Sequence, residues 1–235
     1  MESLLPQMLR RWRFRKRCHA ESESCTEPAL KHYLEAGAEL KPGDMADTPL
    51  IAVDLELTGL DADKDQIISI GWTKIDGGRI QIGSNRHILV NAELSVGASA
   101  AIHELTDTEI SAGVEREAAL SELFDNAAGR VWVFHHAGLD VSFLRRACEE
   151  WAGMAPPFAV LDTMQIELGL RKRRDQPVQQ GDLQLGKLRS DYHLPRYTAH
   201  NALIDAFATA ELLLAIAMRL DSKKPLELGS YLRFV

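Results

Sequence analysis

The chain has 235 residues, with little cysteine and no long apolar run. Its three cysteines, Cys18, Cys25 and Cys148, are odd in number and form no Cys-x-x-Cys unit, which argues against a disulfide framework or a structural zinc site. No apolar stretch approaches the ~20 residues that cross a bilayer. The basic cluster near the start is not followed by the apolar segment of a secretory signal, so we expect a cytoplasmic protein of bacterial type without a signal peptide.

A net basic charge is lacking too, since 27 Lys and Arg stand against 34 Asp and Glu, a formal charge of −7. Residues 10–17, Arg-Arg-Trp-Arg-Phe-Arg-Lys-Arg, carry six of the positive charges and no acid, which leaves 21 basic against 34 acidic residues elsewhere, or −13. This acidic body argues against a protein that coats long duplex DNA through many phosphate contacts. It permits an enzyme that holds only a few nucleotides.

Changes in composition divide the chain into three regions. Residues 1–48 are expected to form a basic, partly helical N-terminal extension, residues 49–220 one domain with a full core, and residues 221–235 a C-terminal tail. The basic cluster is interpreted either as a contact for nucleic acid, an anionic membrane or a partner, or as a solvated helix that docks on the main body. The docking residues would be Leu4, Leu5, Met8, Leu9 and Trp12.

From residue 49 onward, strand and helix patterns alternate. Asp-Gly-Gly at 76–78 separates two apolar runs and predicts a hairpin, and the apolar stripe of 199–220 predicts a long core-facing helix. We therefore expect an α/β fold with a mixed five-stranded sheet flanked by helices. The expected strands cover 50–60, 66–75, 79–90, 130–135 and 158–161, and the expected helices cover 115–127, 139–152, 162–170, 182–191 and 199–220.

Two carboxylates, Asp54 and Glu56, interrupt the apolar pattern of the first strand. Side chains alternate between the faces of a strand, so both carboxylates point the same way, about 7 Å apart along the chain. Like charges on one face repel each other and burial adds a desolvation cost, which makes a divalent metal the simplest compensating group. The alternative is an edge strand with a solvated acidic face.

Three further segments carry polar groups that packing does not explain. Asp140 follows the fourth strand, where active-site groups often lie, although a first-turn helix acid is the alternative. Asp205 lies beside the apolar stripe of the last helix, and His200 is expected in its entry loop, either near the same site or exposed to solvent. Asp162 and Thr163, at a strand-to-helix junction, are interpreted as a helix cap.

Together these segments supply four carboxylates and one histidine. Such oxygen ligands suit Mg²⁺ or Mn²⁺ rather than zinc, because further His and Cys ligands are lacking. Two such ions ~4 Å apart can activate a water and stabilise the leaving oxygen of a phosphodiester. A histidine, with an ordinary pKa of about 6.5, is a suitable base for that water.

At this point the motifs resemble those of the DEDDh 3′–5′ exonucleases, a family that includes the proofreading epsilon subunit of bacterial DNA polymerase III. The resembling stretches, in the family's order, are Asp-Leu-Glu-Leu-Thr-Gly-Leu at 54–60, Ala-Ile-His-Glu-Leu-Thr at 101–106, His-His-Ala-Gly-Leu-Asp at 135–140 and His200 followed by Asp205. They cover roughly residues 49–220. The family's usual Asp-Thr-Glu-Thr-Thr-Gly and His-Asn-Ala are altered here, but neither change touches a ligand position. The Asp-Leu-Glu also resembles the first motif of the oligoribonuclease branch.

The resemblance implies a ribonuclease H-like fold and a two-metal site. It implies that two Mg²⁺ or Mn²⁺ ions are held by Asp54, Glu56, Asp140 and Asp205, with His200 as the general base. The residues expected at the 3′-terminal nucleotide are Thr58, Gly59, Leu60, His103, His135 and His136.

The expected activity is the hydrolysis of single-stranded DNA from its 3′ end to nucleoside 5′-monophosphates, in proofreading or repair. A DNA polymerase is a candidate partner, although the chain ends soon after the last helix, which favours a free-standing enzyme. The run 171–174 with Lys187, Arg189 and Arg196 forms either phosphate contacts or a solvated loop. The alternatives are a 3′–5′ exoribonuclease that trims RNA ends or short oligoribonucleotides, and an inactive nucleic-acid-binding module.

Overall fold

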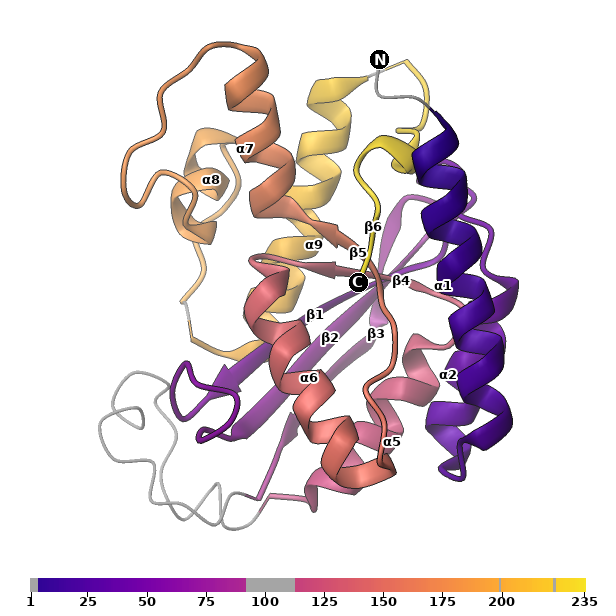
Figure 1. Cartoon of the computed structure of the whole chain (residues 1–235). Coiled ribbons are helices and arrows are strands. Elements are labelled where there is room, and N and C mark those ends of the chain that lie inside the picture. The colour runs from indigo at the N-terminus through magenta and orange to yellow at the C-terminus, as the bar shows by residue number, and fades with distance from the viewer. Residues whose placement is uncertain (1–3, 92–112, 199, 222) are drawn as a thin grey trace.

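A six-stranded mixed sheet forms the centre of the protein, in a computed structural model that describes residues 4–91, 113–198, 200–221 and 223–235 (Figure 1). The predicted His103 lies outside the described residues. The strand order is β3-β2-β1-β4-β5-β6. The strands are β1 (Leu50–Leu57), β2 (Ile67–Asp76), β3 (Arg79–Leu89), β4 (Val131–Phe134), β5 (Ala159–Asp162) and β6 (Arg233–Phe234).

β1 lies at the junction between the antiparallel and the parallel parts of the sheet. It pairs antiparallel with β2 on one side and parallel with β4 on the other. The predicted hairpin between β2 and β3 is confirmed, with Gly77 and Gly78 at φ +60° and +68°, a left-handed conformation that glycine adopts at no steric cost. The predicted mixed sheet is confirmed with one strand more than expected, because the two-residue β6 is too short to show a period-two pattern.

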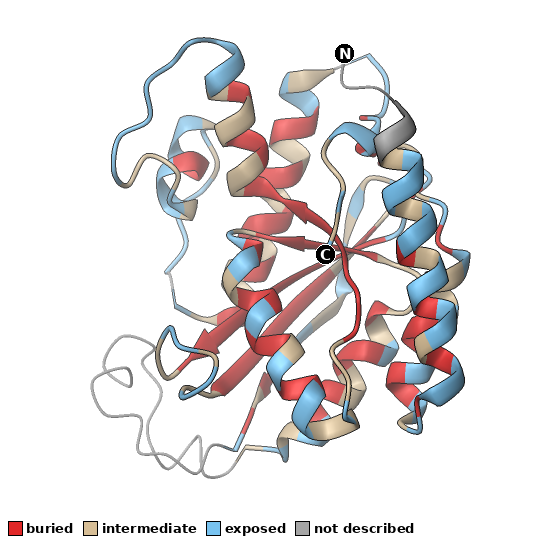
Figure 2. Ribbon diagram, viewed as in Figure 1, coloured by how far each residue is buried: buried red, intermediate tan, exposed pale blue. Residues whose placement is uncertain are grey.

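Helices cover both sides of this sheet. In Figure 1, α6 lies in front of the sheet and α9 behind it. The helices after β3 are α5 (Arg116–Ala127), α6 (Ala137–Ala152), α7 (Thr163–Arg173), α8 (Leu185–Asp191), α9 (Ala202–Leu220) and the short 3₁₀ helix η1 (Leu228–Ser230). α9 packs across β1 and β2, whereas α6 packs on β4 and β5. The strands are buried almost throughout, except for the outer β3 and β6 (Figure 2).

Two N-terminal helices, α1 (Leu4–Ser24) and α2 (Pro28–Glu39), pack on each other and complete the core. The ring of Phe14 lies 5.0 Å from that of Phe234 in β6, and Tyr33 of α2 donates a hydrogen bond to the carbonyl of Pro157. All three cysteines are buried and free, so none of them forms a disulfide. No helix in the described ranges combines the length and the apolar character that crossing a membrane requires.

The docking side of α1 differs from the one that the sequence suggested. Met8, Leu9 and Trp12 are 68%, 47% and 56% exposed, and the side chains of Leu4 and Leu5 are outside the described part of the structure. Phe14 and Cys18, four residues apart, dock instead. The expectation was wrong because several apolar residues occur around this helix, and their spacing alone does not show which of them face the protein.

Candidate active site

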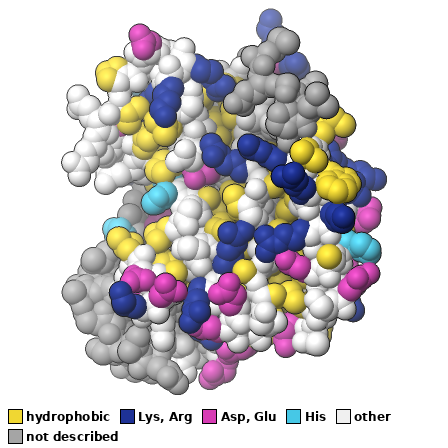
Figure 3. Space-filling model, in the orientation of Figure 1, with side chains coloured by type: hydrophobic (Ala, Val, Ile, Leu, Met, Phe, Trp, Pro, Cys, Tyr) yellow, Lys and Arg dark blue, Asp and Glu magenta, His cyan; other side chains and the backbone are white. Residues whose placement is uncertain are grey.

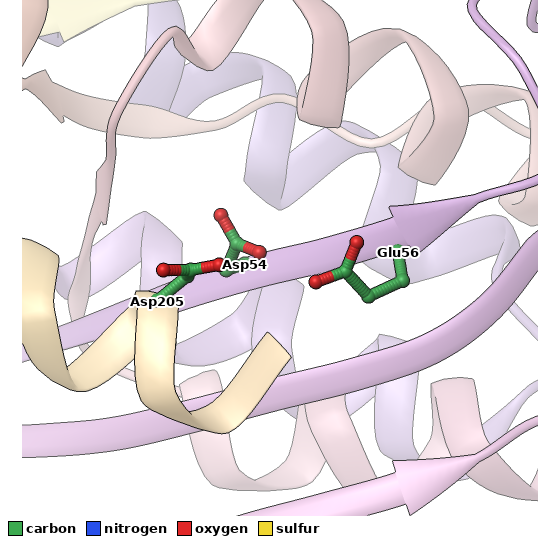
Figure 4. A group of neighbouring side chains, drawn as sticks. All are labelled: Asp54, Glu56 and Asp205. Carbon is green, nitrogen blue, oxygen red and sulfur yellow. The ribbon is translucent and has the colours of Figure 1, made fainter. Parts of the chain in front are cut away.

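Asp54 and Glu56 extend from the face of β1 that α9 covers (Figure 4). The same-face geometry predicted from strand alternation is present, whereas Val53, Leu55 and Leu57 are buried in the core. Asp205, in the first turn of α9, extends from the helix toward Asp54. One carboxylate oxygen from each of these three residues lies within 4.8 Å of the others.

Gly71 of β2 allows α9 to come this close to the sheet. It pairs with Asp54 across the β1–β2 ladder. A Cβ atom at Gly71 would lie 2.1 Å from the backbone carbon of Ala202 and the backbone nitrogen of Leu203. Any larger residue would therefore push the start of α9, and Asp205 with it, away from β1. The sequence reasoning missed this residue, although a single glycine inside an apolar strand indicates close backbone approach.

The start of α9 is held by two local hydrogen bonds. Asn201 caps the helix, its side-chain oxygen accepting from the backbone N–H of Ile204 at 3.2 Å. The backbone N–H of His200 donates to Oδ2 of Asp205 at 2.8 Å. His200 has φ +69°, a conformation that few residues other than glycine adopt, and it lines the same cavity as the three acids. His200 therefore lies in the expected entry loop, where it is exposed and also lines the cavity.

The acids raise one another's pKa. Burial, followed by the charges of Asp140 and Asp205, raises the pKa of Asp54 well above its ordinary value. Burial, followed by the charge of Asp205, raises the pKa of Glu56 to about 8. Burial also raises the pKa of Asp205. Within the described residues, neither Asp54, Asp140 nor Asp205 forms an ion pair with a lysine or arginine.

This donor set fits a divalent cation. Three carboxylates with oxygens within 4.8 Å of one another are hard ligands of the kind that Mg²⁺ and Mn²⁺ take. A cation among them would offset the repulsion and the desolvation that raise their pKa values. Asp54, Glu56 and Asp205 are the residues that would hold it.

Asp140 lies beside this group rather than in it. It is buried in the first turn of α6, and its charge is the largest electrostatic influence on the pKa of Asp54. Burial raises the pKa of Asp140 itself to about 7. Its oxygens are not among those within 4.8 Å of one another. The structure thus brings three of the four predicted ligands together and places the fourth next to Asp54.

Asp162 joins the starts of α6 and α7. Its Oδ1 accepts from the backbone N–H groups of Met164 and Gln165 in α7, as the predicted cap would. The same carboxylate also accepts from the backbone N–H groups of His136 and Ala137, at 3.2 and 3.1 Å. It therefore fixes the helix turn that presents Asp140.

The two predicted substrate histidines lie at this turn and differ in their contacts. Nδ1 of His135 is 2.8 Å from the hydroxyl of Thr163, and Nε2 is 2.9 Å from the carbonyl of Leu183. Both ring nitrogens of His135 are thus bonded within the protein, although the residue also lines the cavity. The side chain of His136 is exposed and its backbone has φ +81°.

The loop after β1 carries the other predicted substrate residues. The hydroxyl of Thr58 accepts from the backbone N–H of Gln66 at 2.9 Å, which closes the loop. A Cβ atom at Gly59 would lie 2.4 Å from a carboxylate oxygen of Asp65, so a larger residue there would displace that side chain. Leu60 at the loop tip is 79% exposed.

The acids form one wall of a cavity of about 760 Å³, and α8 with the segment 195–197 forms another. We call these the acid wall (Asp54, Glu56 and Asp205) and the α8 wall. Arg189 of the α8 wall is buried and donates to the carbonyls of Ala208 and Pro195 and to Glu211, at 2.7, 2.8 and 2.8 Å.

The other basic residues singled out in the sequence divide into two groups. Arg171 pairs with Glu167, Asp182 and Asp191, and its side chain is 12% exposed. Arg171 and Arg189 therefore hold the structure together, whereas Lys187 and Arg196, which line the cavity with Arg189, are exposed. Residues 172–174 are exposed and are not part of this cavity. Lys187 also pairs with Asp191.

Comparison with known proteins shows that this chain is similar to exonucleases. The model of the RNase_T exonuclease family matches residues 51–213. The 3′-5′ exonuclease DinG of Staphylococcus haemolyticus is 28% identical over 171 residues, and the PolC-type DNA polymerase III of Thermotoga maritima is 30% identical over 169. Each alignment covers 72% of this chain but only 18% and 12% of those proteins. The chain therefore spans less than a fifth of their length.

A solved structure shows the same fold. Exonuclease I of E. coli, in complex with a dT13 oligonucleotide, matches with a TM-score of 0.63 and 14% identity, over 74% of this chain and 42% of that one. This likeness confirms the ribonuclease H-like architecture that the motifs implied. The resemblance to the DEDDh 3′–5′ exonucleases is confirmed by the family model, which covers most of the chain. The chain belongs to the RNase_T family of exonucleases.

Proposed function

We propose that this protein is a 3′–5′ exonuclease that removes nucleoside 5′-monophosphates from the 3′ end of a single-stranded nucleic acid, with DNA favoured over RNA. The observation that carries the proposal is the meeting of Asp54, Glu56 and Asp205 in one cavity, where burial raises the pKa of all three and the charges of neighbouring acids raise those of Asp54 and Glu56 further. The names of the relatives support it, since one is a 3′-5′ exonuclease and the other a DNA polymerase.

Two divalent ions, Mg²⁺ or Mn²⁺, are proposed as cofactors. Asp54, Glu56 and Asp205 would hold them, with Asp140 beside Asp54 as the further ligand. Such ions lower the pKa of a bound water and offset charge on a leaving oxygen. The family membership and the donor set support this assignment, because divalent cations would offset the charge of buried acids that repel one another.

His200 is proposed as the general base. Its backbone is fixed to Asp205 by a 2.8 Å hydrogen bond, and the residue lines the cavity beside the acids. A histidine at that position can accept the proton of an attacking water without itself being a metal ligand.

The substrate contacts are proposed on both walls. Leu60, 79% exposed at the tip of the loop after β1, would pack on the terminal base, with Thr58 and Gly59 approaching the nucleotide through their backbone. Lys187 and Arg196 on the α8 wall would contact phosphates. His135 and His136 are proposed as neighbours of the strand, although His135 would have to give up a bond to Thr163 or Leu183 in order to donate or accept.

A role at DNA ends, in proofreading or repair, extends the proposal. The PolC-type relative is a DNA polymerase, and the solved Exonuclease I is bound to a single DNA strand. A DNA polymerase is therefore the proposed protein partner in the proofreading case.

The decisive experiment incubates a 5′-labelled single strand with the protein and Mg²⁺ or Mn²⁺. Shortening from the 3′ end with release of 5′-monophosphates is expected, and EDTA should stop it. Asp54→Asn should be inactive, whereas Asp47→Asn, an exposed acid away from the cavity, should retain activity. RNA of equal sequence tests the sugar preference. Failure to shorten any strand with either metal, or full activity of Asp54→Asn, would refute the proposal.

A further inference from the structure

Four arginines form a basic face on α1 and α6, apart from the residues of the cavity. Arg10, Arg13 and Arg17 are spaced by three and four residues, so they lie along one side of α1. Arg15 bonds to α2 from another side of the helix, through the carbonyl of Ala38 and through Glu39. We call Arg10, Arg13, Arg17 and Arg145 the arginine face.

Contacts between α1 and its neighbours place these residues together. Arg17 donates through Nη2 to the carbonyl of Ala155, in the segment that follows α6, at 2.6 Å. Arg145 lies close enough to Arg17 for the two positive charges to repel, and burial together with that repulsion lowers the pKa of Arg145. Figure 3 shows Lys and Arg side chains gathered over α1 and beside α6 on this side of the molecule.

The positive charge of this face is only partly balanced. Arg10 and Arg13 are exposed and form no ion pair with any described residue. Arg17 pairs with Glu21 at 2.6 Å, whereas Nε of Arg145 is buried and donates to no residue within the described ranges. Although the chain has a net charge of −7, this face gathers guanidinium groups that can donate hydrogen bonds to an anion.

α6 leads from the site toward this face. Arg145 follows Asp140 by five residues, which is about 8 Å along the helix axis and about 140° around it, so a strand would have to pass around α6 to reach both places. Arg10 to Arg17 span about 10 Å of α1. From these placements we infer that the arginine face binds the phosphate backbone of the substrate strand, upstream of the nucleotides held in the cavity. This inference rests on the proposed function and adds to it a second contact with long single strands. Guanidinium groups are well suited to phosphates, and each neutralised phosphate makes binding salt-dependent.

The test compares Arg10→Gln/Arg13→Gln with Lys31→Gln/Arg79→Gln, which removes two positive charges from exposed residues elsewhere. Glutamine preserves the helix, and neither arginine bonds to another described residue, so both variants should melt like the unmodified protein. Binding of an oligothymidylate of ~30 nucleotides is measured in EDTA, where no hydrolysis occurs, across a range of salt concentrations. The arginine variant should bind roughly tenfold more weakly at ~0.1 M salt, and its log–log salt slope should be smaller by about 1.4.

Two outcomes would overturn the inference. One is an unchanged affinity and salt slope, or an equal loss in both variants, which would reflect net charge alone. The other is normal DNA binding with loss of binding to anionic vesicles or to polyglutamate, which would assign the face to a membrane or a protein. Hydrolysis of a trinucleotide, too short to reach α1, should be the same in both variants and in the unmodified protein. Because strand binding in EDTA needs no catalysis, an inactive enzyme would refute the proposed function without deciding this inference.

Discussion

The acid wall and the α8 wall face the same cavity but differ in the charges that lie next to their buried ionisable groups. On the α8 wall, Arg189 bonds to two carbonyls and to Glu211, and its guanidinium lies 4.6 Å from the ring centre of Tyr197. On the acid wall, burial and the charges of neighbouring acids raise the pKa of Asp54, and burial raises the pKa of Asp205. Matched charges keep a segment in place, whereas mutually repelling charges indicate a ligand.

Removing one acid should have the largest effect on activity. We expect Asp54→Asn to lower kcat by at least ~10²–10³-fold, because the proposed metal site would lose one of its ligands. The metal-free variant should melt at a higher temperature than the unmodified protein, since a repulsive buried charge is gone. Activity assays with Mn²⁺ and melting curves in EDTA measure both. A lower melting temperature would contradict the view that the acid wall is strained without metal.

Placing a side chain at Gly71 should displace Asp205 from the other residues of the acid wall. In Gly71→Ala the new Cβ would meet the backbone of α9 at 2.1 Å, so the helix must shift. We expect activity to fall by roughly 10²-fold and the free energy of unfolding by about 1–3 kcal/mol. Gly83→Ala on β3, where a Cβ meets nothing within 4 Å, is the control and should change neither. Equal behaviour of the two variants would show that the contact does not position Asp205.

Removing a buried arginine of the α8 wall should lower both stability and kcat, whereas removing one elsewhere should lower stability alone. Arg189→Gln leaves Glu211 without its 2.8 Å partner and frees the segment at Pro195. We expect a loss of about 3–5 kcal/mol in stability and a kcat roughly tenfold lower, because that segment leads to His200. Arg171→Gln, which breaks a comparable group of ion pairs away from residues 195–200, should lose stability with little change in the kcat of the folded fraction.

The metal-free protein should lose stability as the pH rises. The pKa values of Glu56, about 8, and Asp140, about 7, exceed those of an unfolded chain, so the folded state retains protons that the unfolded state has lost. Each retained proton lowers the free energy of unfolding by about 1.4 kcal/mol per pH unit, from pH ~4 up to the folded pKa. Melting in EDTA should show a steeper fall for the unmodified protein than for Glu56→Gln, and Mg²⁺ or Mn²⁺ should reduce it. Parallel curves would contradict the raised pKa of Glu56.

The smallest effect is expected at the edge of the acid wall. Leu60→Ala should raise KM several-fold for single strands and leave kcat and the melting temperature unchanged, because the side chain is 79% exposed. Ile82→Ala on β3, 72% exposed and apart from the cavity, is the control. A fall in kcat without a change in KM would contradict a role of Leu60 in substrate binding.

Short-range patterns were sufficient to predict the sheet and the acids. Strand alternation placed Asp54 and Glu56 on one face, and the turn glycines predicted the hairpin, because both depend on neighbouring residues alone. Partners distant in sequence were not predictable. The contact of Gly71 with α9 and the ion pair of Arg189 with Glu211 join segments that are far apart in the sequence. Local residue patterns do not show how such segments pack. The exposed side of α1 was misassigned for the same reason.

The contact at Gly71 also has a consequence for design. Main-chain atoms of β2 and α9 touch directly there, so the distance between Asp54 and Asp205 is set by backbone against backbone rather than by exchangeable side chains. Residues around the cavity could then be replaced to change the preferred strand while this spacing is kept. Transplanting the pair of acids to another sheet-and-helix scaffold would require a glycine at the matching crossing point.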